Sequence, residues 1–220
     1  MSTEALLKLL WTATQKTLYM TFWSSLFAYL IGLPLGVLLT VTKKNGIKPA
    51  PVLNSVLGVV VNFLRSIPFI ILLVMLVPVT RLVMGKAIGT ESVVFPMVIS
   101  AFPYVARMVE SSLDEVDHGI LEAAQSMGST NSQIIFKVLL PEAVPSLVNG
   151  AAISVTTILG YTAMASAVAG GGLGVEAITT GYQQRHFEVL YSASFALVIL
   201  VQLITVSGGR LTHLFDHRRK

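Results

Sequence analysis

Five long blocks of apolar residues constrain the fold of this chain more than any other feature of its sequence. A membrane-crossing helix needs about 20 mainly apolar residues, because it must cover roughly 30 Å of hydrocarbon at 1.5 Å per residue. Five blocks reach this length: Leu18 to Val41, Val52 to Thr80, Ser92 to Val109, Leu147 to Val168 and Val189 to Val206. Only 12% of the residues are charged, whereas soluble domains carry about 25%. We therefore expect an all-α polytopic membrane protein with five transmembrane helices.

The two ends of the chain differ from these blocks. The stretch "ALLKLLW" is too short to span a membrane and contains Lys8, so residues 1–16 are expected to form an interfacial segment. Residues 17–210 then form the transmembrane domain, and residues 211–220 a basic tail. Lys and Arg accumulate in cytoplasmic segments, and here they favour the tail and the loops after the first and third blocks. We expect the N-terminus outside and the C-terminus in the cytoplasm.

A polar stretch from about residue 110 to 145 separates the third block from the fourth. It contains "EAAQSMGSTNSQIIFKVLLP", residues 122–141, and is too long for a passive connection. The letters "EAAQSM" favour a helix, which Gly128 can end with a left-handed residue. A second helix can follow a cap supplied by Ser129, Thr130 or Asn131. We expect a helix-turn-helix at the cytoplasmic surface.

The second helix of this loop is expected to be amphipathic and short. Its apolar stripe consists of Ile134, Ile135, Val138 and Leu139. Pro141 is expected to stop the helix, because proline has no N–H to donate to the preceding turn. An amphipathic hairpin that rests on lipid would show the same pattern, so the residues alone leave both interpretations open.

The spacing of this loop resembles the signature cytoplasmic loop of bacterial ABC importer permeases. That signature reads EAA, three residues, Gly, nine residues, an aliphatic residue, any residue, then Leu-Pro. The matching positions are Glu122, Ala123, Ala124, Gly128, Val138, Leu140 and Pro141, with Val138 in place of the commoner Ile. In that family the loop forms coupling helices that dock in a groove of a separate cytoplasmic ATPase. The resemblance implies that these residues, with Ile134 on the apolar stripe, form an ATPase-coupling loop.

Two further segments, "NFLRSIPFIILL" (62–73) and "GYTAMASAVAGGGLG" (160–174), look like parts of methionine importer permeases. This resemblance implies an ABC type-1 transmembrane domain that carries D- and L-methionine across the bacterial inner membrane as a homodimer. It also implies two copies of an ATPase, which binds ATP and Mg²⁺, and a periplasmic or lipid-anchored methionine-binding protein. The chain itself would bind no cofactor and catalyse no reaction. The alternatives are a permease for another small or polar amino acid, or an ATP-independent channel or structural membrane protein.

Other polar residues lie inside or beside the apolar blocks. In the fourth block Ser154, Thr157 and Tyr161 share a helical face, and together with Met164 they are candidates for a pore lining and gate. Hydroxyl bonds between helices and a gap filled by Met164 would explain the same residues. Arg65 either snorkels or caps carbonyls freed by Pro68, or it braces the coupling loop through Glu110 or Glu122.

Several glycines and carboxylates are expected to have structural roles and not to form a binding site. Gly32 and Gly36 fit the small-residue pattern of helix packing. "AGGGLG" (169–174) lacks the spacing of a phosphate loop, and we expect a flexible bend there. The acidic edge consists of Glu110, Asp114, Glu115 and Asp117. It is expected to be a solvated helix face.

Several function classes lack the residues they need. The chain has no cysteine, and its four histidines are dispersed at positions 118, 186, 213 and 217, so we expect no metal site. The basic residues are scattered over short loops and one tail, which argues against nucleic-acid binding. The apolar blocks hold no Asp or Glu of the kind that proton-coupled transporters use as relays.

Overall fold

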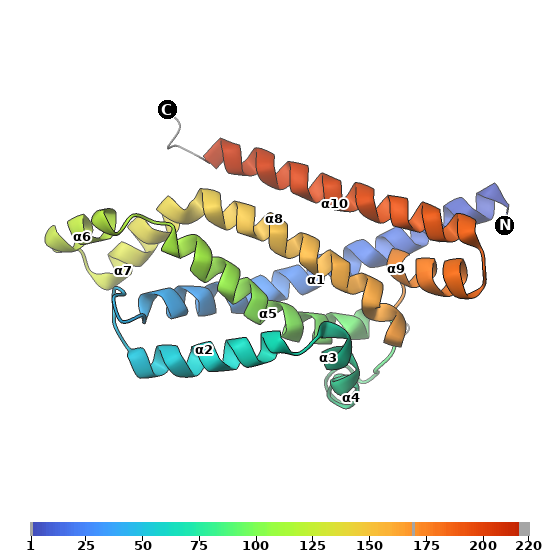
Figure 1. Ribbon diagram of the computed structural model, residues 1–220, viewed down its shortest axis with the longest axis horizontal. Helices are drawn as coiled ribbons and strands as arrows, with labels where there is room; N and C mark the ends of the chain where they lie inside the picture. The colour runs from blue at the N-terminus through green and yellow to red at the C-terminus, as the bar shows by residue number, and fades with distance from the viewer. Residues whose placement is uncertain (1, 169, 216–220) are drawn as a thin grey trace. The chain divides into compact units, whose positions relative to one another are not determined.

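The computed structural model describes residues 2–168 and 170–215, and within them all regular structure is helical (Figure 1). The elements are α1 (Thr3–Val41), α2 (Pro51–Ser66), α3 (Phe69–Met75), α4 (Val77–Met84), α5 (Thr90–Asp114), α6 (His118–Ser126), α7 (Asn131–Ile134), the π-helical η1 (Ile135–Leu139), α8 (Leu140–Met164), the 3₁₀ turn η2 (Ala165–Val168), α9 (Leu173–Glu176), the π-helical η3 (Ala177–Gln183) and α10 (Phe187–Phe215). Residues 216–220 of the expected basic tail lie outside the described part.

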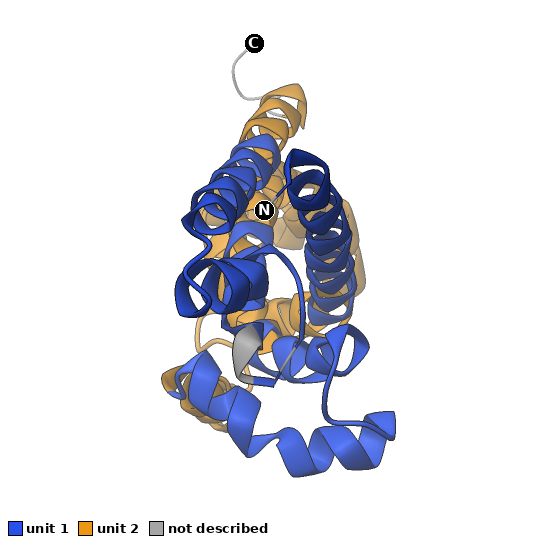
Figure 2. Ribbon diagram, turned by 90° about the vertical axis from the view of Figure 1, so that its right-hand side faces the viewer, with its two compact units in different colours: residues 1–28, 67–101, 155–205 blue, residues 29–66, 102–154, 206–220 orange. Residues whose placement is uncertain are grey.

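The chain forms two compact units, which Figure 2 shows in different colours. Unit 1 comprises residues 1–28, 67–101 and 155–205, and unit 2 comprises residues 29–66, 102–154 and 206–220. Among the described residues, four helical stretches are long and apolar enough to cross a membrane: α1, α5, the stretch from α7 through α8, and α10. The bent pair α2 and α3 makes a fifth if it is taken as one span. The all-α membrane fold expected from the sequence is confirmed.

The second apolar block is not one helix, so the continuous span expected from Val52 to Thr80 is wrong. Helix α2 ends at Ser66, and α3 begins only at Phe69. The cause is Pro68, which cannot donate the helical hydrogen bond and disfavours a helical backbone at the residue before it. Pro68 instead has an extended backbone, with φ −55° and ψ 134°, and precedes the first turn of α3. The block therefore turns sharply at the proline.

Helix α1 runs without a break through the expected border between residues 16 and 17. Its 39 residues give a length of about 58 Å at 1.5 Å per residue, whereas the hydrocarbon core is roughly 30 Å thick. A large part of α1 must therefore extend beyond the hydrocarbon. That residues 1–16 are this part stays a prediction.

In unit 1 the glycine-rich segment packs against α1. Gly172 has a left-handed φ of 98°, and a Cβ there would lie 2.8 Å from the Thr17 hydroxyl oxygen. That same oxygen accepts a hydrogen bond of 2.9 Å from the Leu173 N–H. Leu173 is fully buried with Ala13 and Ala177. Among its described residues, 170–174, the segment expected to be a flexible bend is thus an ordered packing contact, while Ala169 lies outside the described residues.

In unit 2 two glycines bring α1 close to α5. A Cβ on Gly32 would lie 2.7 Å from Val105, and one on Gly36 would lie 2.6 Å from the Ala106 carbonyl oxygen. Both distances are shorter than van der Waals contact allows, so only glycine fits at this separation. The helix-packing interpretation of these glycines is confirmed, and the packing fixes the end of α1 beside α5.

Candidate functional site

The first arm of the polar loop is a helix with defined ends. Helix α6 begins after Asp117, whose side chain accepts a hydrogen bond of 2.6 Å from the Gly119 N–H. After the helix, Gly128 adopts a left-handed φ of 79°, and its N–H donates to the Gln125 carbonyl. The predicted role of Gly128 as the residue that ends this helix is confirmed.

The second arm begins with a capping box. Of the three candidate caps, Thr130 is the one used: its hydroxyl accepts a hydrogen bond from the Gln133 N–H. The Gln133 side chain in turn accepts one of 2.8 Å from the Thr130 N–H. Each residue satisfies a backbone N–H that the first helical turn would leave unpaired. Helix α6 contacts both α7 and η1, so the two arms form one unit, here called the hairpin (residues 117–139).

Pro141 does not stop the second arm, which corrects the sequence-based expectation. Instead α7 continues through the π turn η1 into α8, and Pro141 lies in the first turn of α8. The Leu140 N–H donates to the carbonyl of Ile135, five residues earlier. A π turn widens the helix at this point, which removes the clash of the proline ring with the carbonyl four residues before it. The second arm of the hairpin and α8 therefore form one continuous helical stretch from Asn131 to Met164.

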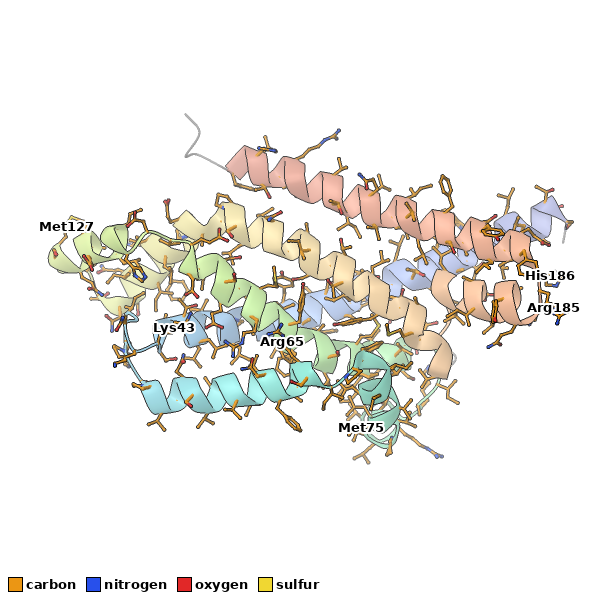
Figure 3. The ribbon with its side chains drawn as sticks, viewed as in Figure 1. Lys43, Arg65, Met75, Met127, Arg185 and His186 are labelled. Carbon is orange, nitrogen blue, oxygen red and sulfur yellow. The ribbon has the colours of Figure 1, made fainter. Side chains whose placement is uncertain are left out.

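The apolar stripe of the second arm faces the interior of unit 2. Ile134 and Leu139 are fully buried, while Ile135 and Val138 are half-buried. Ile134 thus holds the hairpin together and is not free to touch a partner. Other apolar side chains of the hairpin are exposed, and two of them most of all: Met127, 79% exposed at its tip (Figure 3), and Phe136, 69% exposed. Sequence reasoning missed both, although Met127 directly precedes the helix-ending glycine.

The EAA residues divide between the two sides of α6. Glu122 and Ala123 are exposed, whereas Ala124 is buried. The small Ala124 side chain suits the side of α6 that packs inside unit 2, whereas Ala123 is exposed and Glu122, although exposed, lines the cavity described below. In the second arm Leu140 is half-buried and Pro141 exposed.

At the root of the hairpin four charged residues form what we call the charge clamp: Lys43, Arg107, Glu110 and Asp114. Arg107 Nη1 donates to Glu110 Oε2 at 2.6 Å, and Lys43 Nζ lies 3.0 Å from Glu110 Oε1. Lys43 also pairs with Asp114. Glu110 is buried, so the solvated acidic edge expected from the sequence is wrong at this residue. The missed signal is the spacing of Arg107, Glu110 and Asp114, which places three charges on one helical face.

Arg107 connects the clamp to α2, and the two carboxylates of the clamp raise the pKa of Lys43. Arg107 Nη2 donates to Asn62 Oδ1 at 3.0 Å and to the Gly58 carbonyl at 3.3 Å. Burial lowers the pKa of Lys43, but hydrogen bonds and charge from Asp114 and Glu110 outweigh this effect, and the pKa is raised. The lysine is therefore held in its charged form beside the two carboxylates.

Arg65 does not brace Glu110. Its side chain is exposed and makes no hydrogen bond or ion pair with another described residue. The partners of Glu110 are Arg107 and Lys43, and Glu122, the other expected partner, is exposed. Arg107 therefore has the bracing position that the sequence suggested for Arg65.

The four candidate pore residues of α8 have different surroundings. Ser154 is fully buried in unit 2. In unit 1, Thr157 is half-buried and Tyr161 stacks on Phe69, with ring centroids 4.5 Å apart and planes 14° from parallel. Met164 is 43% exposed. Of these four candidates Met164 is the exposed one, and the pore and gate roles stay predictions.

A cavity of about 570 Å³ lies in unit 2 behind α6. Its walls are the segment after α1, the end of α5 and the inner side of α6; among its lining residues are Lys43, Lys44, Asp114, Leu121, Glu122 and Gln125. Within residues 2–168 and 170–215, no three His, Asp or Glu side chains converge as a metal site would require.

The chain is similar to known proteins of one family over nearly its whole length. The family described as "Binding-protein-dependent transport system inner membrane component" matches residues 12–220. The chain is 47% identical over 210 residues to the probable D-methionine transport system permease protein MetI of Vibrio cholerae, covering 96% of this chain and 93% of that protein. It is 43% identical over 209 residues to the methionine import system permease protein MetP of Bacillus subtilis, covering 95% and 94%.

A solved structure is similar over the same length. A chain of the MetNI methionine ABC transporter, from a study of its inward-facing conformations, matches with a TM-score of 0.96 at 44% identity. The match covers 99% of this chain and 100% of that one. The match therefore includes the residues of the hairpin and of the spans.

Proposed function

The chain belongs to the family of binding-protein-dependent transport system inner membrane components, and we propose that within it this protein is the permease subunit of an ATP-driven methionine importer. Relatives that are 43–47% identical over nearly the whole chain are named for methionine or D-methionine transport, which supports methionine, as the D and L forms, as the substrate. It is a multi-pass inner membrane protein, and the ATPase activity belongs to a separate subunit.

The observation that carries this proposal is the hairpin with its exposed apolar tip. A polar loop that only connects two spans needs no capped helices and no large apolar side chain in water. Met127 is long, flexible and polarizable, which suits it to fill a groove in a partner. We propose that the partner is a cytoplasmic ATPase, present in two copies, and that ATP and Mg²⁺ bind there.

The helix that continues from the hairpin supplies a mechanism. Because the 34 residues from Asn131 to Met164 are helical throughout, a displacement of the hairpin moves the start of α8 with it. ATP binding would draw the two ATPases together, pull the hairpins and open the permease outward, and hydrolysis would restore the inward state. ATP can shift this equilibrium only by as much as it binds the two conformations differently.

We propose the remaining partners from the number of spans and from the family of the chain. Four or five spans are too few to enclose a substrate path, so we propose a second copy of this chain as a two-fold mate. Met164, exposed at the end of α8, is our candidate for the gate between the mates. A periplasmic or lipid-anchored methionine-binding protein would deliver substrate at the outer face, with the N-terminus outside and the C-terminus inside.

Copurification with the ATPase tests the docking. We expect Met127→Asp and Phe136→Asp each to reduce the retained ATPase about tenfold or more, because a charge in a desolvated groove is costly. Asn45→Asp, an exposed position outside the hairpin, adds the same charge and is the matched control. Full retention by both hairpin variants would favour the alternative class, an ATP-independent channel or structural membrane protein.

A further inference from the structure

We propose that the charge clamp positions the hairpin: Glu110, held by Lys43 and Arg107, passes hairpin movement to α1 and α2. Lys43, Arg107 and Glu110 are positioning residues in this account, because they would act on transport through the hairpin and not on the substrate. The inference rests on the proposed function, since it assumes that an ATPase moves the hairpin.

Glu110 joins segments that are separate in the sequence. Its two oxygens bind different cations, Oε2 to Arg107 on α5 and Oε1 to Lys43 just after α1. Arg107 continues the connection to α2 through Asn62 and the Gly58 carbonyl. Glu110 therefore joins α5 to the segment after α1, and Arg107 joins both to α2, so that three segments of unit 2 far apart in the sequence are connected.

The free energy of the Glu110 ion pairs also favours a positioning role. A buried ion pair must overcome the cost of removing both charges from water, and apolar residues of the same volume often stabilise a fold as well or better. What such a pair supplies is geometry, because it is strong only in a narrow range of distances and angles. The pairing of Glu110 with Lys43 and Arg107 therefore fits a role in fixing position better than a role in stability alone.

The clamp lies at the root of the hairpin. Asp114, paired with Lys43, is the last residue of α5, and Asp117 caps α6 three residues later. The hairpin is thus attached at two points, by the clamp at α5 and by the π turn at α8. A displacement of α6 would pull on Asp114 and Lys43 before it reached the rest of unit 2.

Helix α6 has room to move against the clamp. The cavity of about 570 Å³ lies between them, with Lys43 and Asp114 on one wall and Leu121 and Gln125 on the other. Packed cores resist displacement, whereas an open space lets one element shift. In addition Arg107 Nε is buried and has no hydrogen-bond partner among the described residues. An unpaired buried donor is costly, and a second arrangement of the clamp would allow it to pair.

The experiment measures coupling in proteoliposomes that contain this chain, its ATPase and a methionine-binding protein. The readout is the amount of radiolabelled methionine taken up per ATP hydrolysed. We expect Glu110→Gln to lower this ratio about tenfold, in line with common coupling free energies, while the ATPase still copurifies and still hydrolyses ATP. Lys43→Met should act in the same direction, and Lys44→Met, at the exposed neighbouring lysine, should leave the ratio unchanged.

A merely structural role would give a different pattern. It would lower the thermal midpoint and the yield of complex but leave the ratio of uptake to hydrolysis intact in the complexes that form. If Glu110→Gln fails to fold, Lys43→Met decides, because that lysine side chain is 35% exposed and its loss leaves Arg107 on Glu110. Wild-type coupling in both Glu110→Gln and Lys43→Met overturns the clamp. Absence of ATP-dependent uptake in the unmodified protein overturns the proposed function instead.

Discussion

Lys43 shows how a single residue of the clamp responds to pH. Burial lowers its pKa, the two carboxylates raise it by more, and the net direction is upward from the ordinary value of 10.5. A group whose pKa is raised by folding contributes stability that is complete below its unfolded pKa and is lost as the pH rises through its folded pKa. We expect the difference in thermal midpoint between the unmodified protein and Lys43→Met to stay level from about pH 7 to pH 9. A difference that already shrinks within this range would contradict the raised pKa.

The residue scale also shows what sequence reasoning can identify. Gly128 and Thr130 were predictable, because a left-handed helix end and a capping box depend only on neighbours within a few residues. Ile134 was identified as a loop residue, but its burial was not foreseen, since an apolar stripe has the same spacing whether it faces a partner or its own chain. The pairing of Lys43 with Glu110 lies beyond local patterns, because 67 positions separate the two residues.

At the scale of elements, the contact of α1 with α5 depends on two glycines. We expect Gly36→Leu to lower the free energy of unfolding by about 1–3 kcal/mol, because the added side chain must force the helices apart. The measurement is the thermal midpoint in detergent. Gly209→Leu on α10 is the matched control, since a Cβ there meets nothing within 4 Å. Equal midpoints for Gly36→Leu and the unmodified protein would contradict the close packing.

The two prolines account for the two element boundaries that the sequence-based prediction missed. Pro68 breaks the second block, as the general rule for proline inside a helix would have indicated. Pro141 obeys the same chemistry but lies directly after the π turn η1, which the residue pattern did not predict. The five blocks themselves were predictable because bilayer thickness fixes their length. Their continuity was not, since it depends on how each proline is accommodated.

At the scale of the whole molecule, the direction of insertion is a testable expectation. The chain has no cysteine, so single cysteines can report which side of the membrane each loop faces. We expect Gln184→Cys to react with a membrane-impermeant maleimide in intact spheroplasts, and Asn45→Cys to react only after permeabilisation. Both positions are exposed, so burial does not limit labelling. The reverse pattern would place the hairpin outside and exclude a cytoplasmic ATPase as its partner.

The central claim is that ATP drives methionine import through the hairpin. The most direct test is the uptake of radiolabelled methionine into proteoliposomes that hold this chain, its ATPase and a binding protein, with the unmodified chain and with Met127→Asp. The account predicts uptake that requires ATP and falls to background in the variant, which should still fold because Met127 is 79% exposed. Methionine flux that needs no ATP and is the same in Met127→Asp would contradict it.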